Sequence, residues 1–112
     1  MKINKELIKG STTMFILKLL SRGDMYGYQM IRELEEQSDN TFTLKEGTLY
    51  PILNLLESDG MIESYWEDTE SARKRKYYKI TNNGKKLLAE KEKEWEIYSN
   101  AVNKVIGGAG LA

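Results

Sequence analysis

The sequence contains no cysteine, no histidine and only one proline among its 112 residues. Without thiol or imidazole side chains it has no disulfide framework, no thiolate or imidazole ligands for zinc, no cysteine nucleophile and no imidazole-based catalytic triad. A small enzyme would then depend on paired carboxylates or on a lysine in a pocket, and the sequence shows no such constellation. We therefore expect a protein that is not an enzyme and that uses neither a metal nor a cofactor.

Long apolar runs and an excess of either charge are also missing. No stretch approaches the roughly 18 apolar residues of a membrane-spanning helix, so we expect no signal peptide, no membrane contact and a cytoplasmic protein. The 17 basic and 17 acidic residues cancel, and any contact with nucleic acid has to come from a local patch. A chain of this length has room for one domain with one modest core.

Two helical patterns occupy the first third of the chain. Residues 4–21 place apolar side chains on more than one face, which predicts a single helix buried on two sides. Residues 25–37 repeat apolar groups at Tyr26, Met30 and Leu34, the spacing of a helix that buries one side. The hydroxyl groups of Tyr26 and Tyr28 either contact phosphate or belong to buried packing.

A third helix is expected to end near Ser58. Thr43-Leu44-Lys45-Glu46 has the form of a capping box that would open it. Because Pro51 cannot donate to the carbonyl of Gly47, the helix either kinks or begins later, nearer Thr48. Its apolar stripe consists of Leu49, Ile52, Leu53 and Leu56, and the other side carries Lys45, Thr48, Tyr50, Pro51 and Asn54.

A β-hairpin follows this helix. Residues 61–67 and 75–81 are rich in β-branched and aromatic side chains and predict two strands around a polar turn at 68–74. Trp66 is expected to pack beneath the hairpin. Between residues 57 and 70 the chain has six acidic residues and no basic one, whereas Arg73, Lys74, Arg75, Lys76 and Lys79 follow within seven positions, interleaved with Tyr77 and Tyr78.

The last helix opens at Asn82-Asn83-Gly84 and ends at Gly107-Gly108. Its apolar positions are spaced by seven, with Leu88, Trp95 and Val102 in one register and Tyr98 and Val105 in the other. The seam lasts under three heptads, which favours a short helix packed across another subunit over a long coiled coil. Residues 109–112 are expected to form a disordered tail.

The order of these elements predicts a winged helix-turn-helix, a mainly α fold with a small β-hairpin. In that fold the third helix enters the DNA major groove and the hairpin, or wing, grips the flanking backbone. Clustered Lys and Arg bind phosphate by displacing counterions, although such a run is also compatible with a solvated turn. We predict a DNA-binding domain over residues 1–81, a C-terminal dimerisation helix over 82–108 and the tail at 109–112.

Three stretches resemble the PadR family of bacterial transcriptional regulators: GDMYGYQMIREL, EGTLYPILNLLESDGMI and RKYYKITNNGK. The resemblance implies a homodimer in which the last helix of each subunit packs on the first helix of the other. Such a dimer would bind a pseudo-palindromic double-stranded DNA operator with half-sites roughly 34 Å apart. The resemblance places Lys45, Thr48, Tyr50 and Asn54 in the groove and Arg73, Lys74, Arg75, Lys76 and Tyr77 on the backbone.

One departure from the family concerns the wing tip. Family wings often carry a tip with Gly or Pro before RKYY, whereas this chain has Glu70-Ser71-Ala72. The conformation of the tip therefore stays open.

Within the family, SYWEDTE followed by RKYY and by a tryptophan in the last helix is most similar to regulators of the lactococcal multidrug-binding type. There, one tryptophan from each subunit lines a pore at the dimer centre and stacks planar aromatic compounds. The resemblance implies a ligand site formed by Leu7, Met14, Lys18, Trp95, Tyr98 and Ser99. Trp95 could instead fill the dimer interface, and Lys18 and Lys91 either favour anionic ligands or extend to solvent.

The leading hypothesis is therefore a dimeric DNA-binding repressor that planar hydrophobic ligands release from its operator. Such a ligand acts only through different affinities for two dimer arrangements. The alternative is a winged-helix protein-interaction module without specific DNA binding, for which the Lys and Arg cluster would not be needed.

Overall fold

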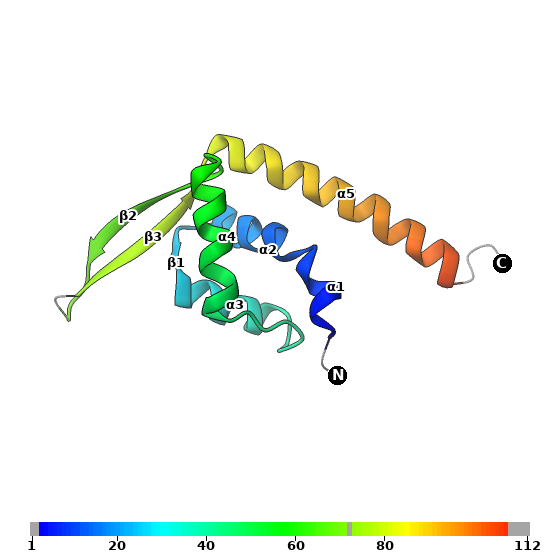
Figure 1. The fold of residues 1–112 in the computed structure, drawn as a ribbon, viewed down its shortest axis with the longest axis horizontal. Helices are drawn as coiled ribbons and strands as arrows, with labels where there is room; N and C mark the ends of the chain where they lie inside the picture. The colour runs from blue at the N-terminus through cyan, green and yellow to red at the C-terminus, as the bar shows by residue number, and fades with distance from the viewer. Residues whose placement is uncertain (1–2, 72, 108–112) are drawn as a thin grey trace.

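The computed structural model describes residues 3–71 and 73–107. Figure 1 shows a helical body from which the hairpin and the last helix extend in opposite directions. This arrangement confirms the predicted winged helix-turn-helix. The elements in chain order are α1 (Lys5–Lys9), α2 (Thr12–Arg22), β1 (Met25–Tyr26), α3 (Gly27–Gln37), α4 (Glu46–Ser58), β2 (Ile62–Asp68), β3 (Lys74–Ile80) and α5 (Asn82–Ile106).

The prediction of a single helix over residues 4–21 is wrong, because the helix is interrupted at Gly10 and Ser11. Gly10 ends α1 and donates its N–H to the carbonyl of Ile8. The Thr12 hydroxyl donates to the same carbonyl over 3.2 Å. Glycine loses much backbone entropy in a helix, and Ser and Thr compete for backbone groups, so this stretch favours a break. Helix α2 then buries several apolar side chains completely or nearly so.

The second helix begins later than predicted, because Met25 and Tyr26 form strand β1. This strand pairs antiparallel with β3, with Met25 opposite Tyr78 and Tyr26 opposite Tyr77. A strand of two residues is too short to show the alternation that marks strands in a sequence. Helix α3 starts at Gly27, and the predicted stripe at Met30 and Leu34 is buried.

Helix α4 begins at Glu46, so the predicted cap at Thr43 is wrong. Lys45 is the N-cap residue, with extended backbone and no side-chain hydrogen bond to the helix. Pro51 lies inside the helix. The core stripe is confirmed, since Leu49, Leu53 and Leu56 are buried and Ile52 packs against the core.

The three strands form an antiparallel sheet in the order β1-β3-β2. Strands β2 and β3 pair from Ile62 opposite Ile80 to Asp68 opposite Lys74. Both lie within one residue of their predicted bounds. Ile62 and Ile80 face the helices and are buried, whereas Trp66 is 63% exposed. The expectation that Trp66 packs beneath the wing is therefore wrong, because the hairpin extends beyond the body (Figure 1).

The start of helix α5 is joined to the helical body by hydrogen bonds of Thr81. The Thr81 hydroxyl accepts from the Gly84 N–H at 3.1 Å and donates to the Gly60 carbonyl at 2.7 Å. Gly84 and Leu88 are the buried residues of this helix. Farther along the predicted seam, Trp95 is 49% exposed and Val105 is 83% exposed. Gly108 and the predicted tail lie outside the described residues.

No helix within residues 3–71 and 73–107 combines the length and the apolarity that crossing a bilayer requires.

Candidate nucleic-acid interface

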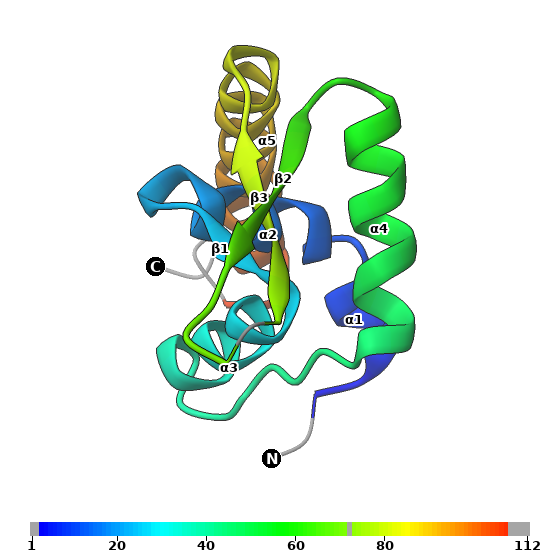
Figure 2. The same ribbon diagram turned by 90° about the vertical axis from the view of Figure 1, so that its left-hand side faces the viewer.

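The outer face of α4 is open to solvent along its whole length. At 100° per residue, Gly47, Pro51, Asn54 and Ser58 point most directly away from the buried stripe, and all are exposed. The predicted groove residues Lys45, Thr48, Tyr50 and Asn54 are also exposed. Figure 2 shows α4 standing beside the hairpin, so both elements are available on neighbouring surfaces.

Tyr50 is held in place by the first turn of α3. A Cβ atom added to Gly27 would lie 2.8 Å from Cζ of Tyr50 and would also overlap its hydroxyl. The glycine therefore makes room for the ring, which is 39% exposed. Of the two tyrosines beside Gly27, Tyr28 is exposed and lies under Arg32 at 6.0 Å, while Tyr26 belongs to the sheet.

The strand period divides the predicted wing residues between two faces. Lys74 and Lys76 share the face of the buried Ile80, which is the face toward α4. Lys76 confirms this direction, since its Nζ lies 4.0 Å from Glu57 of α4. Arg75 and Tyr77 lie on the opposite face, and Arg73 precedes the strand in the turn. The structure therefore does not bring these five residues together on one surface.

A row of tyrosines crosses the opposite face of the sheet. The Tyr77 ring lies 5.5 Å from Tyr26 and 5.8 Å from Tyr65, and the Arg75 guanidinium lies 4.5 Å above Tyr26. The Tyr65 hydroxyl donates to Asp24 over 2.7 Å. This hydrogen bond is the main reason why the pKa of Tyr65 rises to about 12. The row ties the base of the wing to the helical body.

A second candidate site lies where α1 and α2 face α5. A hollow of about 370 Å³ contains four predicted ligand residues, Leu7, Met14, Trp95 and Tyr98, together with Glu6, Gly10, Ser11, Lys91 and Glu94. The Trp95 and Tyr98 rings lie 6.0 Å apart. The other two predicted residues are not part of it. Lys18 pairs with Glu92 at 3.4 Å, and the Ser99 hydroxyl donates to the Glu96 carbonyl.

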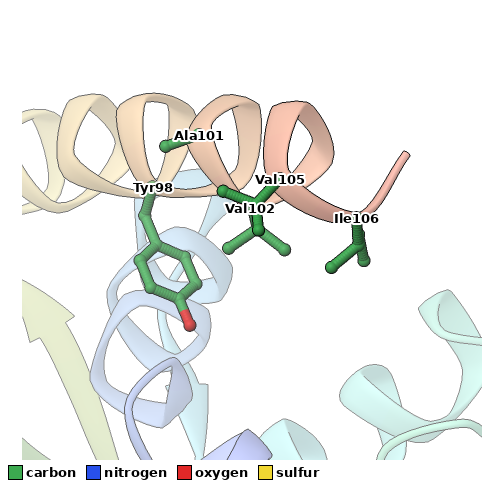
Figure 3. Close-up of a pocket in the computed structure, with 5 residues that line it drawn as sticks. All are labelled: Tyr98, Ala101, Val102, Val105 and Ile106. Carbon is green, nitrogen blue, oxygen red and sulfur yellow. The ribbon is translucent and has the colours of Figure 1, made fainter. Parts of the chain in front are cut away.

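An apolar hollow of about 330 Å³ continues along α5 and is lined by Tyr98, Ala101, Val102, Val105 and Ile106. Figure 3 shows Tyr98, Val102 and Ile106 projecting from the same side of the helix. The side chains that line it form a continuous apolar strip without a charged group. In a single chain, Leu88 of the predicted seam is buried, whereas Trp95, Tyr98 and Val105 are left exposed.

Comparison with known proteins settles the family. The model described as "Transcriptional regulator PadR-like family" matches residues 16–90. This chain belongs to the PadR-like family.

Relatives and solved structures agree with the family. Protein X of Lysinibacillus sphaericus, uncharacterized by its name, is 40% identical over 93 residues, which cover 83% of this chain and 85% of that protein. The solved structure of a transcriptional regulator from Clostridium thermocellum has a TM-score of 0.84 and 35% identity, covering 91% of this chain and 99% of that one. Transcriptional regulator YqjI of Escherichia coli is 28% identical over 91% of this chain, which spans only 47% of that relative.

As a PadR-type transcriptional regulator, the chain is not an enzyme. In the part of the chain that the structure describes, no group of three or more acidic side chains could hold a metal ion. Sequence reasoning missed the two carboxylates of the hollow, Glu6 and Glu94, and the tyrosine row at Tyr65. The presence of a tyrosine in each of the three strands is a signal that could have suggested this row. The strand register, which the sequence does not reveal, is what places the three rings side by side.

Proposed function

We propose that this PadR-type regulator binds a double-stranded operator as a homodimer, represses transcription there, and is released by planar hydrophobic ligands. The observation that carries DNA binding is the open outer face of α4 beside an extended wing whose Lys74 and Lys76 face the same helix. An exposed helix of this kind fits the major groove, and the wing ammonium groups lie within reach of the flanking phosphates.

The second copy of the chain is proposed to cover α5. The exposed apolar side chains on one side of it include Trp95, Tyr98, Val105 and Ile106, and Leu7 of α1 is 67% exposed. A surface of this extent is unusual on a monomer and is typical of an interface. In the proposed dimer, α5 of each subunit packs on α1 of the other, residues 1–81 bind DNA and residues 82–108 hold the subunits together. The operator is then pseudo-palindromic, with half-sites roughly 34 Å apart.

DNA binding is tested by footprinting on the region upstream of the protein's own gene, followed by affinity measurements at several salt concentrations. Changing Lys74 and Lys76 together to Ala should weaken binding and reduce the log–log salt slope by about 2, because two phosphate contacts disappear. The control changes Lys93 and Lys104, both exposed on α5, to Ala. Unchanged affinity and slope in the first variant would favour the protein-interaction module.

To test repression, transcription has to be measured in addition to the footprint. A reporter placed behind the footprinted region should become more active when the gene for the regulator is deleted. Lower activity after deletion would make the protein an activator and would contradict this part of the proposal.

The proposed ligand site is the hollow beside Trp95, and its charges indicate which ligands it prefers. Glu6 and Glu94 line it against a single ammonium group, that of Lys91. Lys18 is engaged by Glu92 instead. Two carboxylates facing one ammonium favour planar cations over planar anions, because the nearby charges are mostly of opposite sign to the cation. Indole and phenol rings add π faces on which a flat molecule can stack.

Tryptophan fluorescence distinguishes a role of Trp95 in ligand binding from a role in filling the dimer interface. Planar cationic dyes should quench Trp95 and release DNA in the footprint, whereas planar anionic dyes should do so only weakly. Glu94→Gln should reduce the preference for cations. Equal quenching in wild type and Trp95→Leu would exclude this site, and loss of dimerisation in Trp95→Leu would show that the ring mainly fills the interface.

A further inference from the structure

Trp66 is the large side chain that the fold leaves without an evident role. It lies on β2, is 63% exposed, and makes none of the aromatic ring pairs found among the described residues. An exposed indole on an extended hairpin contributes little to the core, since it stays largely in water. A partner that removes the ring from water would account for its position.

The strand period fixes the direction in which Trp66 points. Alternate residues of β2 share a face, so Trp66 lies on the side of Ile62 and Ser64. Ile62 is buried against the body, and the Ser64 hydroxyl bonds the Glu57 carboxylate of α4. Trp66 is therefore on the wing face that looks toward α4. Figure 2 shows that helix beside the hairpin.

The register gives Trp66 a cationic neighbour. Most basic side chains of β3 face an acid across the ladder, namely Lys79 with Glu63, Arg75 with Glu67 and Lys74 with Asp68. Lys76 instead lies opposite Trp66. Its ion pair with Glu57, at 4.0 Å between groups that are each about a third exposed, is weak and can be exchanged for a phosphate.

We infer that Trp66 is a DNA-contacting residue that packs its ring against deoxyribose at the minor groove flanking the α4 site, while Lys74 and Lys76 bind the adjacent phosphates. The inference rests on the proposed DNA binding and adds an apolar contact to it. Duplex DNA fits this face because it presents apolar sugar edges between anionic groups, and proteins that bind the minor groove frequently place apolar side chains in it. The tyrosine row on the opposite face is already packed against itself and the Arg75 guanidinium.

The salt dependence of binding distinguishes an apolar contact from a phosphate contact. On the footprinted duplex, Trp66→Ala should lose about five- to tenfold in affinity, within the range for removing an aromatic ring that packs on nucleic acid. Its salt slope should match wild type, because no counterion is involved, whereas Lys76→Ala should lower the slope by about 1. Trp66→Phe should retain most of the affinity, and the matched control on the opposite face, Tyr65→Phe, should retain all of it.

Wild-type affinity in Trp66→Ala, alongside weaker binding in the Lys74 and Lys76 double variant, would overturn the inference and leave the proposed function standing. No binding of the upstream duplex by wild type would overturn both. Thermal unfolding checks the fold of each variant, and an exposed side chain should leave the midpoint nearly unchanged.

A second measurement does not require the ring to be removed. The chain has two tryptophans, so Trp95→Phe leaves Trp66 as the only indole reporter. Addition of the footprinted duplex should change its emission at the same concentrations that produce the footprint, and a mixed-sequence duplex should require more DNA. Emission that stays constant while DNA is bound would show that Trp66 lies away from the duplex and would overturn the inference.

Discussion

Replacing Gly84 by Ala should destabilise the protein, although the same change in most helices is stabilising. Gly84 is in the first turn of α5, where its backbone lies against the start of the hairpin. An added Cβ would overlap the backbone carbonyl oxygen of Met61 and would lie 2.7 Å from Cγ1 of Ile80. A backbone carbonyl cannot rotate away as a side chain can, so α5 or the hairpin has to shift.

The magnitude follows from two opposing effects. Overpacking of a buried site costs about 1–3 kcal/mol, and the carbonyl contact places Gly84→Ala in the upper half of that range. The gain from replacing glycine in a helix is about 0.5–1 kcal/mol. The difference is a loss of about 1–2.5 kcal/mol in the free energy of unfolding. For a chain of this size it lowers the thermal midpoint by about 5–10 °C.

Gly47→Ala provides the matched control. Gly47 is also in the first turn of a helix, α4, and a Cβ atom there would meet nothing within 4 Å. This variant should gain about 0.5–1 kcal/mol, so the two substitutions should move the midpoint in opposite directions. Both are compared with wild type by thermal unfolding at one protein concentration, because association shifts the midpoint. A midpoint for Gly84→Ala at or above wild type would refute the reasoning.

Three further predictions concern the surface of α4, the wing and the start of α5. Gly27→Ala should displace the Tyr50 ring and weaken operator binding with little change in the thermal midpoint, since a flexible side chain yields at low cost; unchanged affinity would show that Tyr50 does not contact DNA. The Tyr65 pKa of about 12 exceeds its ordinary 10.0, so the stabilisation from its hydrogen bond to Asp24 is complete below pH 10 and disappears as pH rises toward 12. Asp24→Asn should return that pKa toward 10.0 in a difference absorbance titration against Tyr65→Phe, and an unaltered titration would contradict the assigned cause. Thr81→Ala removes both the cap of α5 and the hydrogen bond to the Gly60 carbonyl between α4 and β2, and should lower the free energy of unfolding by about 1 kcal/mol, measured by denaturant titration; a loss under a few tenths would contradict it.

The sequence predicted the elements whose patterns are long. The stripe of Leu49, Leu53 and Leu56 and the two wing strands lie where their periods place them, because burial on one face imposes the same spacing on sequence and structure. The sequence patterns did not predict the short elements. Strand β1 consists of Met25 and Tyr26, and its existence depends on β3 as a partner from a distant part of the chain.

Other errors came from competition between local and distant interactions. Thr43 has the chemistry of an N-cap, yet the buried Leu44 draws the preceding backbone against the core and the helix starts after Lys45. Large aromatic side chains are usually buried, so the sequence predicts Trp66 beneath the hairpin, and only the length of the wing beyond the body shows otherwise. The separation of Arg75 from Lys76 follows from the strand period, because neighbouring residues of β3 point to opposite faces.

Helix α5 extends far beyond its last buried residue, Leu88. An isolated helix is marginally stable in water, so contacts from the proposed second subunit would stabilise the outer turns of α5. In the proposed dimer those contacts come from the second subunit, and a lone subunit carries a fraying arm that proteases can cleave. Unpaired chains would then be removed before they occupy half of an operator. In the proposed dimer, the length of α5 thus links the lifetime of each molecule to the abundance of its own kind.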